Sequence, residues 1–143
     1  MKIAVLSLGN PLKQDDNIGN LIVDKLQNKF KDNNFNFFQA FLSPESYIIP
    51  LKELKPDIIY FIDAVESDDE VGKVSLFDID DVITLGASST HSIPVTAYKN
   101  HLPDAKIRII GIKVKETGFG ENLTEYINEK FDDILEEVEK IIS

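Results

Sequence analysis

Acidic and histidine side chains lie in three polar segments that each follow an apolar or alternating run of the chain. Asp15 and Asp16 follow the first apolar run, Asp63 lies at the end of the most apolar run, and His91 lies among small hydroxyl residues at positions 88–92. Two carboxylates and one imidazole supply the oxygen and nitrogen donors that suit a divalent ion such as nickel or zinc. Because these residues are far apart in the sequence, only the fold can bring them together.

Each of these residues also has an ordinary structural explanation. An Asp before a helix commonly caps it, and of the pair we expect Asp15 to be the cap and Asp16 the ligand. Asp63 is harder to explain by structure alone, because a carboxylate at the end of a buried strand costs desolvation energy unless it is paired, capped or metal-bound. His91 could simply hydrogen bond a backbone carbonyl group.

Hydrophobic periodicity and turn signals predict the elements that position these residues. Apolar or alternating runs mark strands, and apolar residues at spacings of three and four mark helices. Ser43-Pro44-Glu45 is a helix-start signature, in which the Ser43 side chain could cap the first free amides of the helix. Strands are predicted over residues 2–8, 35–42, 57–64, 71–78 and 105–114, and helices over residues 17–30, 43–54, 93–102 and 123–141.

This order of elements predicts one α/β domain spanning residues 1–143. The expected fold is a three-layer α/β/α sandwich around a five-stranded, mostly parallel twisted sheet, of the phosphorylase/hydrolase-like type. Residues 57–64 are apolar on both faces and should form its centre, whereas residues 71–78 follow too closely for a crossover helix and should form an antiparallel edge strand. Ligands of such sheets bind beyond the carboxyl ends of the strands, where the three polar segments should meet.

Composition narrows the class of protein. Fifteen basic against 25 acidic residues give a formal charge of −10, which argues against nucleic-acid binding. The acidic run on the last predicted helix (Glu125, Glu129, Asp132, Asp133, Glu136 and Glu137) should be its solvated face. No apolar run approaches the roughly 18 residues of a membrane span, and the first residues do not resemble a signal peptide. The chain has no cysteine, which excludes disulfides and thiolate ligands. We therefore expect a cytoplasmic protein without membrane insertion.

Several common catalytic motifs are missing. The chain contains no phosphate-binding G-x-x-x-x-G-K-[ST] loop, no G-x-G-x-x-G turn, no G-x-S-x-G elbow and no H-E-x-x-H pair. Nucleotide hydrolysis and simple serine-hydrolase chemistry are therefore disfavoured.

The ordered motifs resemble those of the hydrogenase maturation endopeptidases, which trim the C-terminal extension of nickel–iron hydrogenase large subunits after nickel insertion. The similarity runs nearly from end to end. It comprises Leu8-Gly9-Asn10-Pro11-Leu12 with Asp15-Asp16 and Gly19, Ser43-Pro44-Glu45, Leu54-Lys55-Pro56, Phe61-Ile62-Asp63-Ala64, Val71-Gly72-Lys73-Val74, Ser89-Thr90-His91-Ser92-Ile93-Pro94 and Ile110-Gly111-Ile112. Segments 44–45 and 90–94 most resemble the branch that serves formate-hydrogenlyase-type and related energy-converting hydrogenases.

The resemblance implies a site and a partner. The metal-contacting and catalytic residues of an aspartic-type endopeptidase would be Asp16, Asp63 and His91, acting on nickel already held by the precursor. The attacking water could be activated by the metal, which lowers the pKa of bound water, or by an aspartate acting as general base. We expect a monomer that is largely metal-free when purified, because three ligands without a thiolate suit transient capture of an ion.

Two departures from the family pattern keep other functions open. Ser7 replaces the first glycine of the opening motif, and residues 39–43 replace an Asp-Gly-Gly-Thr-like turn linked to substrate handling. The alternatives are a checkpoint protein that binds the nickel-loaded subunit without cutting it, and an unrelated small-molecule α/β hydrolase that shares the sandwich.

Overall fold

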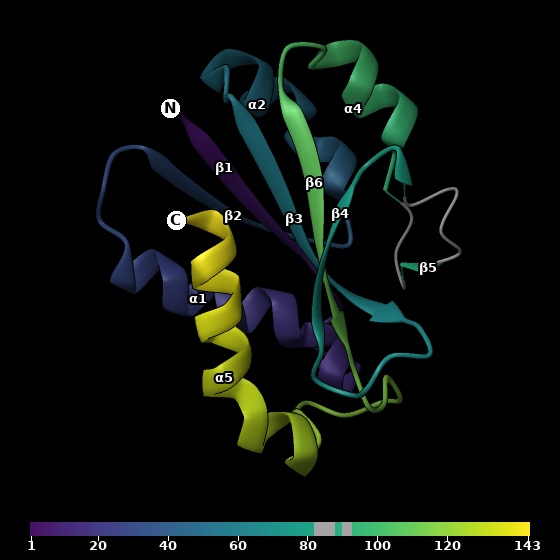
Figure 1. Cartoon of the computed structure of the whole chain (residues 1–143). Coiled ribbons are helices and arrows are strands. Elements are labelled where there is room, and N and C mark those ends of the chain that lie inside the picture. Colours follow the sequence, from purple (N-terminus) through teal and green to yellow (C-terminus); the bar gives the residue numbers. More distant parts are fainter. Residues whose placement is uncertain (82–87, 90–92) are drawn as a thin grey trace.

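A computed structural model describes residues 1–81, 88–89 and 93–143 of the chain. Its sheet has the strand order β2-β1-β3-β6-β4, and a two-residue strand, β5, pairs with β3 (Figure 1). The strands are β1 (Ile3–Leu8), β2 (Phe35–Phe41), β3 (Ile58–Glu66), β4 (Val74–Asp78), β5 (Ser88–Ser89) and β6 (Lys106–Lys113). Strands β2, β1, β3 and β6 are parallel, and β4 is antiparallel to β6. The predicted mostly parallel sheet with an antiparallel edge strand is confirmed.

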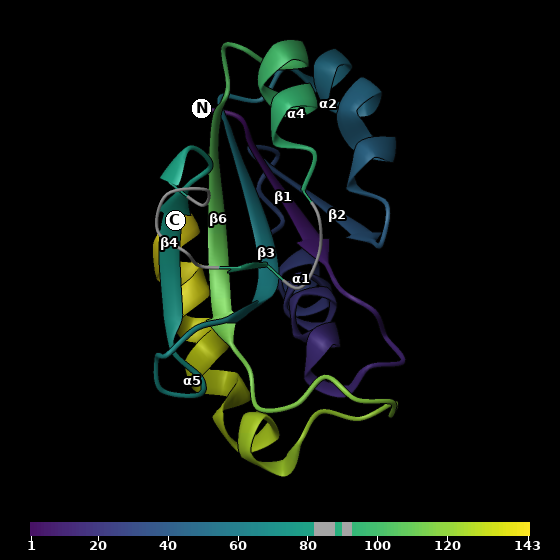
Figure 2. The same cartoon turned by 90° about the vertical axis from the view of Figure 1, so that its right-hand side faces the viewer.

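Helices cover both faces of the sheet and complete the three predicted layers. They are α1 (Ile18–Lys29), α2 (Ile48–Leu54), α4 (Val95–His101) and α5 (Glu125–Ile142). Helices α1 and α5 pack on one face, and α2 and α4 pack on the other (Figures 1 and 2). Strand β3 contributes buried side chains to both cores, as expected for the most apolar strand of a parallel sheet.

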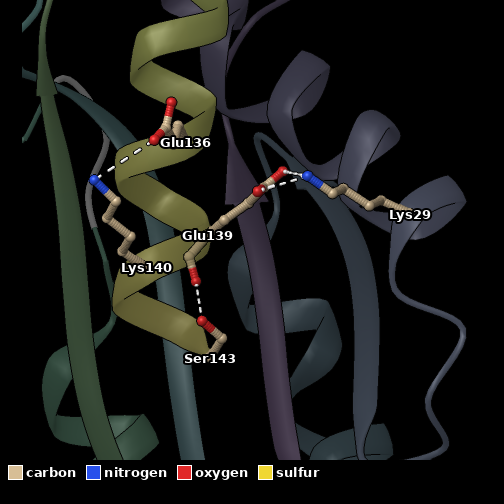
Figure 3. A network of polar contacts seen from close by, with 5 residues as sticks. All are labelled: Lys29, Glu136, Glu139, Lys140 and Ser143. Carbon is tan, nitrogen blue, oxygen red and sulfur yellow. Dashed lines mark hydrogen bonds and ion pairs between the residues drawn. The ribbon is translucent and has the colours of Figure 1, made fainter.

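The last helix presents its acidic run to solvent, as predicted, and buries Ile127, Ile134, Val138 and Ile142. Its final turns are tied to α1 by Lys29, whose Nζ lies 2.8 and 2.9 Å from the two carboxylate oxygens of Glu139 (Figure 3). An ion pair with an exposed lysine contributes only about 0–1 kcal/mol, so apolar burial is the main force that holds α5 in place.

Two predicted helices begin with a 3-10 turn, η1 (Gln14–Asn17) before α1 and η2 (Pro44–Tyr47) before α2. Pro44 occupies the first turn as predicted, but Ser43 makes no side-chain cap bond, so the capping prediction was wrong. The tighter 3-10 turn satisfies the first amides through backbone bonds instead, such as Ser46 N–H to the Ser43 carbonyl oxygen at 3.1 Å. Among the described residues no helix is both long and apolar enough to cross a membrane.

Candidate active site

Buried polar side chains gather at one edge of the sheet. In the described part of the chain, the buried polar or charged residues are Ser7, Asp15, Asp16, Asn20 and Asp63. They lie on β1, η1, the first turn of α1 and β3, where the parallel strands reach their carboxyl ends. This is the edge at which open α/β sheets bind ligands.

Asp16 lies in η1 with its carboxylate turned back toward the loop that follows β1. Its Oδ2 accepts a hydrogen bond from the Asn10 backbone N–H at 2.9 Å, and the side chain is 2% exposed. A backbone bond of this kind fixes the orientation of the carboxylate before any ligand arrives.

Two glycines allow this loop to lie tightly against the sheet. Gly9 has a φ of +150°, and a Cβ atom there would lie 2.2 Å from the backbone oxygen of Asp16. Gly19, in the first turn of α1, approaches the ends of two strands, because its Cβ would lie 2.7 Å from the Ile62 oxygen and 3.0 Å from the Leu8 oxygen. The start of α1 therefore lies directly beside the residue that precedes Asp63.

Asp63 is fully buried in the central strand. It is the first residue of β3 beyond the β1–β3 register, which ends at Ser7 and Ile62, and it still pairs with Gly111 of β6. The prediction that β3 ends near Asp63 was wrong, because the strand continues to Glu66 through its pairing with β6 and β5. A neighbouring edge strand, which has no local sequence signal, extends β3.

Asp15 has a different role from the predicted helix cap, and that prediction was wrong. Its carboxylate accepts bonds from the backbone N–H groups of Lys115 and Glu116, both at 3.0 Å, and of Thr124 at 2.7 Å. The Thr124 hydroxyl group also lies within 2.8 Å of it. Asp15 thus fixes the connection between β6 and α5 against η1, and Figure 2 shows this connection running from the end of β6 to the segment after β1.

Sequence reasoning missed a buried network beside Asp16. The Ser7 hydroxyl group donates to Asn20 Oδ1 at 2.7 Å, and Asn20 Nδ2 donates to the Gly9 carbonyl oxygen at 3.1 Å and to Asn17 Oδ1 at 2.8 Å. The sequence alone marks Ser7 only as the replacement of a glycine. The available signals were a hydroxyl inside an apolar strand and an amide on the apolar side of a helix, since both need partners when buried.

His91, the third predicted ligand, lies outside the described residues. The described residues on either side of it contact β3 near Asp63: Ser89 pairs with Val65, and the Tyr98 ring centroid of α4 lies 5.0 Å from that of Phe61. Within the described ranges no group of three or more His, Cys, Asp or Glu side chains could hold a metal ion. The donor set of two buried carboxylates and one imidazole is chemically suited to a borderline divalent ion.

A model of the hydrogenase maturation protease family matches residues 21–141. The chain belongs to that family. A hydrogenase maturation protease homologue of Methanocaldococcus jannaschii is 32% identical over 82% of this chain and 75% of the homologue. The hydrogenase 3 maturation protease of Escherichia coli is 24% identical over 97% of this chain and 90% of that protein. The crystal structure of the [NiFe] hydrogenase maturation protease HycI from Thermococcus kodakarensis has a TM-score of 0.83 and 26% identity, covering 98% of this chain and 91% of the other.

Membership in the hydrogenase maturation protease family makes this chain a peptidase by class and confirms the predicted resemblance. The departure at residues 39–43 has a structural consequence. Phe41 ends β2 with a φ of 51°, a left-handed conformation that ordinarily favours glycine. Its carbonyl oxygen accepts a bond from the Gly9 N–H at 2.8 Å, so this turn lies against the Asp16 loop.

Proposed function

We propose that this hydrogenase maturation protease removes the C-terminal extension of a nickel–iron hydrogenase large-subunit precursor after nickel insertion. The observation that carries the proposal is the burial of Asp16 and Asp63 at the carboxyl edge of the sheet, on segments held together at Gly19. The names of its relatives, among them an Escherichia coli hydrogenase 3 protease, support a hydrogenase partner of the formate-hydrogenlyase type.

The proposed substrate carries its own nickel. Asp16, Asp63 and His91 would engage that ion and so admit only precursor that has received it, since carboxylate oxygens and imidazole nitrogens suit such an ion. The described residues Ser89 and Tyr98 contact β3 at Val65 and Phe61, on either side of Asp63. The protein itself then needs no resident metal.

Peptide hydrolysis requires a proton acceptor beside the scissile bond. A water oxygen bonds to the carbonyl carbon, the C–N bond breaks, and the proton released by the water passes to the leaving amine. We assign the proton transfer to an aspartate of this site, which makes the chemistry aspartic in type. The backbone bond from Asn10 holds Asp16 in a fixed orientation, which suits it to contact the nickel.

The experiment is mass spectrometry of the precursor, prepared with and without nickel, after incubation with the protein. We expect loss of one C-terminal peptide from the nickel-loaded form alone. Asp16→Asn, Asp63→Asn and His91→Ala should each slow this loss by about 100-fold or more, the usual contribution of a catalytic acid or base. Asp132→Asn, at an exposed position on α5, is the matched control and should cleave at the wild-type rate.

Two outcomes would contradict the proposal. Unchanged cleavage by Asp63→Asn or His91→Ala would mean that the site is wrongly assigned. Binding of the nickel-loaded precursor without loss of its C-terminal peptide would favour a checkpoint protein instead. The altered turn at residues 39–43 is the observation that favours this alternative.

A further inference from the structure

Four large apolar side chains are exposed at this edge of the sheet, on the loops after β1 and β6 and at the end of β2. Leu12 is 56% exposed, Phe41 40%, Leu42 56% and Phe119 90%. We call these four residues the apolar rim. Contiguous exposed apolar side chains on a small protein commonly mark an interaction surface.

Backbone hydrogen bonds join the loops that carry the apolar rim. The Gly120 N–H donates to the Leu12 carbonyl oxygen at 2.9 Å, which brings the neighbour of Phe119 to Leu12. The Gly9 N–H donates to the Phe41 carbonyl oxygen at 2.8 Å, which brings the turn after β2 to the same loop. These bonds bring the loop after β1, the end of β2 and the loop after β6 to the same edge of the sheet.

Hydrogen bonds also connect the apolar rim to the site. The Leu12 N–H donates to Asn10 Oδ1 at 2.9 Å, and the Asn10 N–H donates to Asp16 Oδ2 at 2.9 Å. The Leu12 backbone is therefore joined to the Asp16 carboxylate through the single residue Asn10. This link places Leu12 of the rim next to the loop that holds Asp16.

The rim carries no charge, although the whole protein carries a formal charge of −10. Residues 9–12, 41–43 and 117–120 contain no Asp, Glu, Lys or Arg. Exposed Lys13, Glu116 and Glu121 border these segments. An apolar centre with a charged border suits a partner that presents apolar side chains at the point of contact.

The loop that carries Phe119 is held firmly in place. Asp15 binds the backbone at positions 115, 116 and 124, and the Gln14 N–H donates to the Gly120 carbonyl oxygen at 2.9 Å. An exposed aromatic side chain on an anchored loop loses little conformational freedom on binding, which makes it an efficient contact residue.

We infer that the apolar rim is the surface on which the precursor large subunit docks, through an apolar segment beside its cleavage point, with Phe119 as the principal anchor. This inference rests on the proposed function. It assigns substrate recognition to residues 12 and 119 in addition to the turn at residues 41–42.

The test measures cleavage kinetics of the nickel-loaded precursor by wild type, by the double variant Leu12→Ser/Phe119→Ser and by Ile49→Ser. Ile49 is the matched control, because it is 69% exposed on α2, outside the rim. We expect the double variant to raise KM about tenfold or more while kcat stays within about twofold, as for loss of an anchoring aromatic residue. Ile49→Ser should leave both constants unchanged.

Other results would overturn the inference without touching the proposed function. If wild type cleaves the precursor and the double variant has an unchanged KM, the rim does not bind the substrate. If size-exclusion chromatography shows a wild-type dimer that the double variant loses, again with unchanged KM, the occupant is a second copy of the chain. Far-ultraviolet circular dichroism checks folding, and Phe119→Ser alone replaces the double variant should Leu12→Ser unfold the protein.

Failure of the proposed function would look different. Wild type would then cleave neither form of the precursor, and co-elution on size-exclusion chromatography would become the readout. Co-elution of nickel-loaded precursor with wild type but not with the double variant would support the docking surface. Equal behaviour of the two proteins would overturn it.

Discussion

Asp15 and Asp16 are neighbours in the chain, but their carboxylates bind different parts of the molecule. Asp16 accepts a bond from the loop after β1, six residues away, and belongs to the candidate site. Asp15 accepts bonds from residues more than 100 positions further along the chain and joins two loops of the same edge. Of these two adjacent acidic residues, Asp15 therefore has a structural role and Asp16 is the candidate catalytic group.

At this residue scale, we expect Asp15→Asn to lower the free energy of unfolding by about 2–3 kcal/mol. The NH2 group of the asparagine would face backbone N–H groups that now donate hydrogen bonds to the carboxylate. Hydrogen bonds to a charged group also contribute more to stability than bonds between neutral groups. Urea unfolding measures the change. Asp132→Asn is the control, and its free energy of unfolding should stay within about 0.5 kcal/mol of wild type. If Asp15→Asn lowers the free energy of unfolding by less than about 1 kcal/mol, the bonds to the β6–α5 connection contribute little to stability.

At the scale of elements, the contact between the start of α1 and the ends of β1 and β3 positions the site. This contact requires a residue without a side chain at Gly19, because the nearest atoms are backbone oxygens of Leu8 and Ile62. Backbone atoms inside a sheet cannot move aside as a flexible side chain can, so any added atom must displace the helix.

Gly19→Ala should therefore destabilise the protein by about 1–3 kcal/mol, the usual cost of overpacking. Helix propensity alone predicts the opposite sign, a gain of about 1 kcal/mol for alanine over glycine. Gly118→Ala is the matched control, because its Cβ would meet only the Gln14 side chain at 3.6 Å. Urea unfolding of the two variants decides between these effects, and a Gly19→Ala protein as stable as wild type would refute the close approach.

At the scale of the whole molecule, the acidic excess is spread over the surface, and the exposed face of α5 carries much of it. Its ion pairs are mostly exposed, such as Lys140 with Glu136 at 3.6 Å (Figure 3), and offset little of the repulsion among 25 acidic residues. Net charge of one sign destabilises a compact state, and salt screens it.

We accordingly expect Tm at pH 7 to rise by about 2–4 °C between low ionic strength and about 0.2 M NaCl, the shift produced by roughly 1 kcal/mol in a chain of this size. The control uses the same protein near its pI of about 4.6, where the net charge is close to zero and the effect should vanish. Differential scanning calorimetry measures both series. A Tm that falls with salt at pH 7 would show that attractive ion pairs outweigh the repulsion.

Apolar patterning was enough to predict the five longer strands, the four α-helices, the three layers and the burial of Asp63. Apolar spacing reports directly which residues face a core, so the unbroken run in β3 and the periodic positions of α5 identify a central strand and an amphipathic helix. The resemblance of the ordered motifs led to the correct family.

Which polar groups meet is apparent only from the packed fold. The bond from Thr124 to Asp15, the bond from Ser7 to Asn20 and the extension of β3 by β5 all join segments that have no local signal for one another. The apolar rim likewise exists because backbone bonds bring Leu12, Phe41 and Gly120 to one edge. Hydrophobic periodicity records burial one segment at a time, whereas a hydrogen bond between distant segments depends on how the complete sheet is packed.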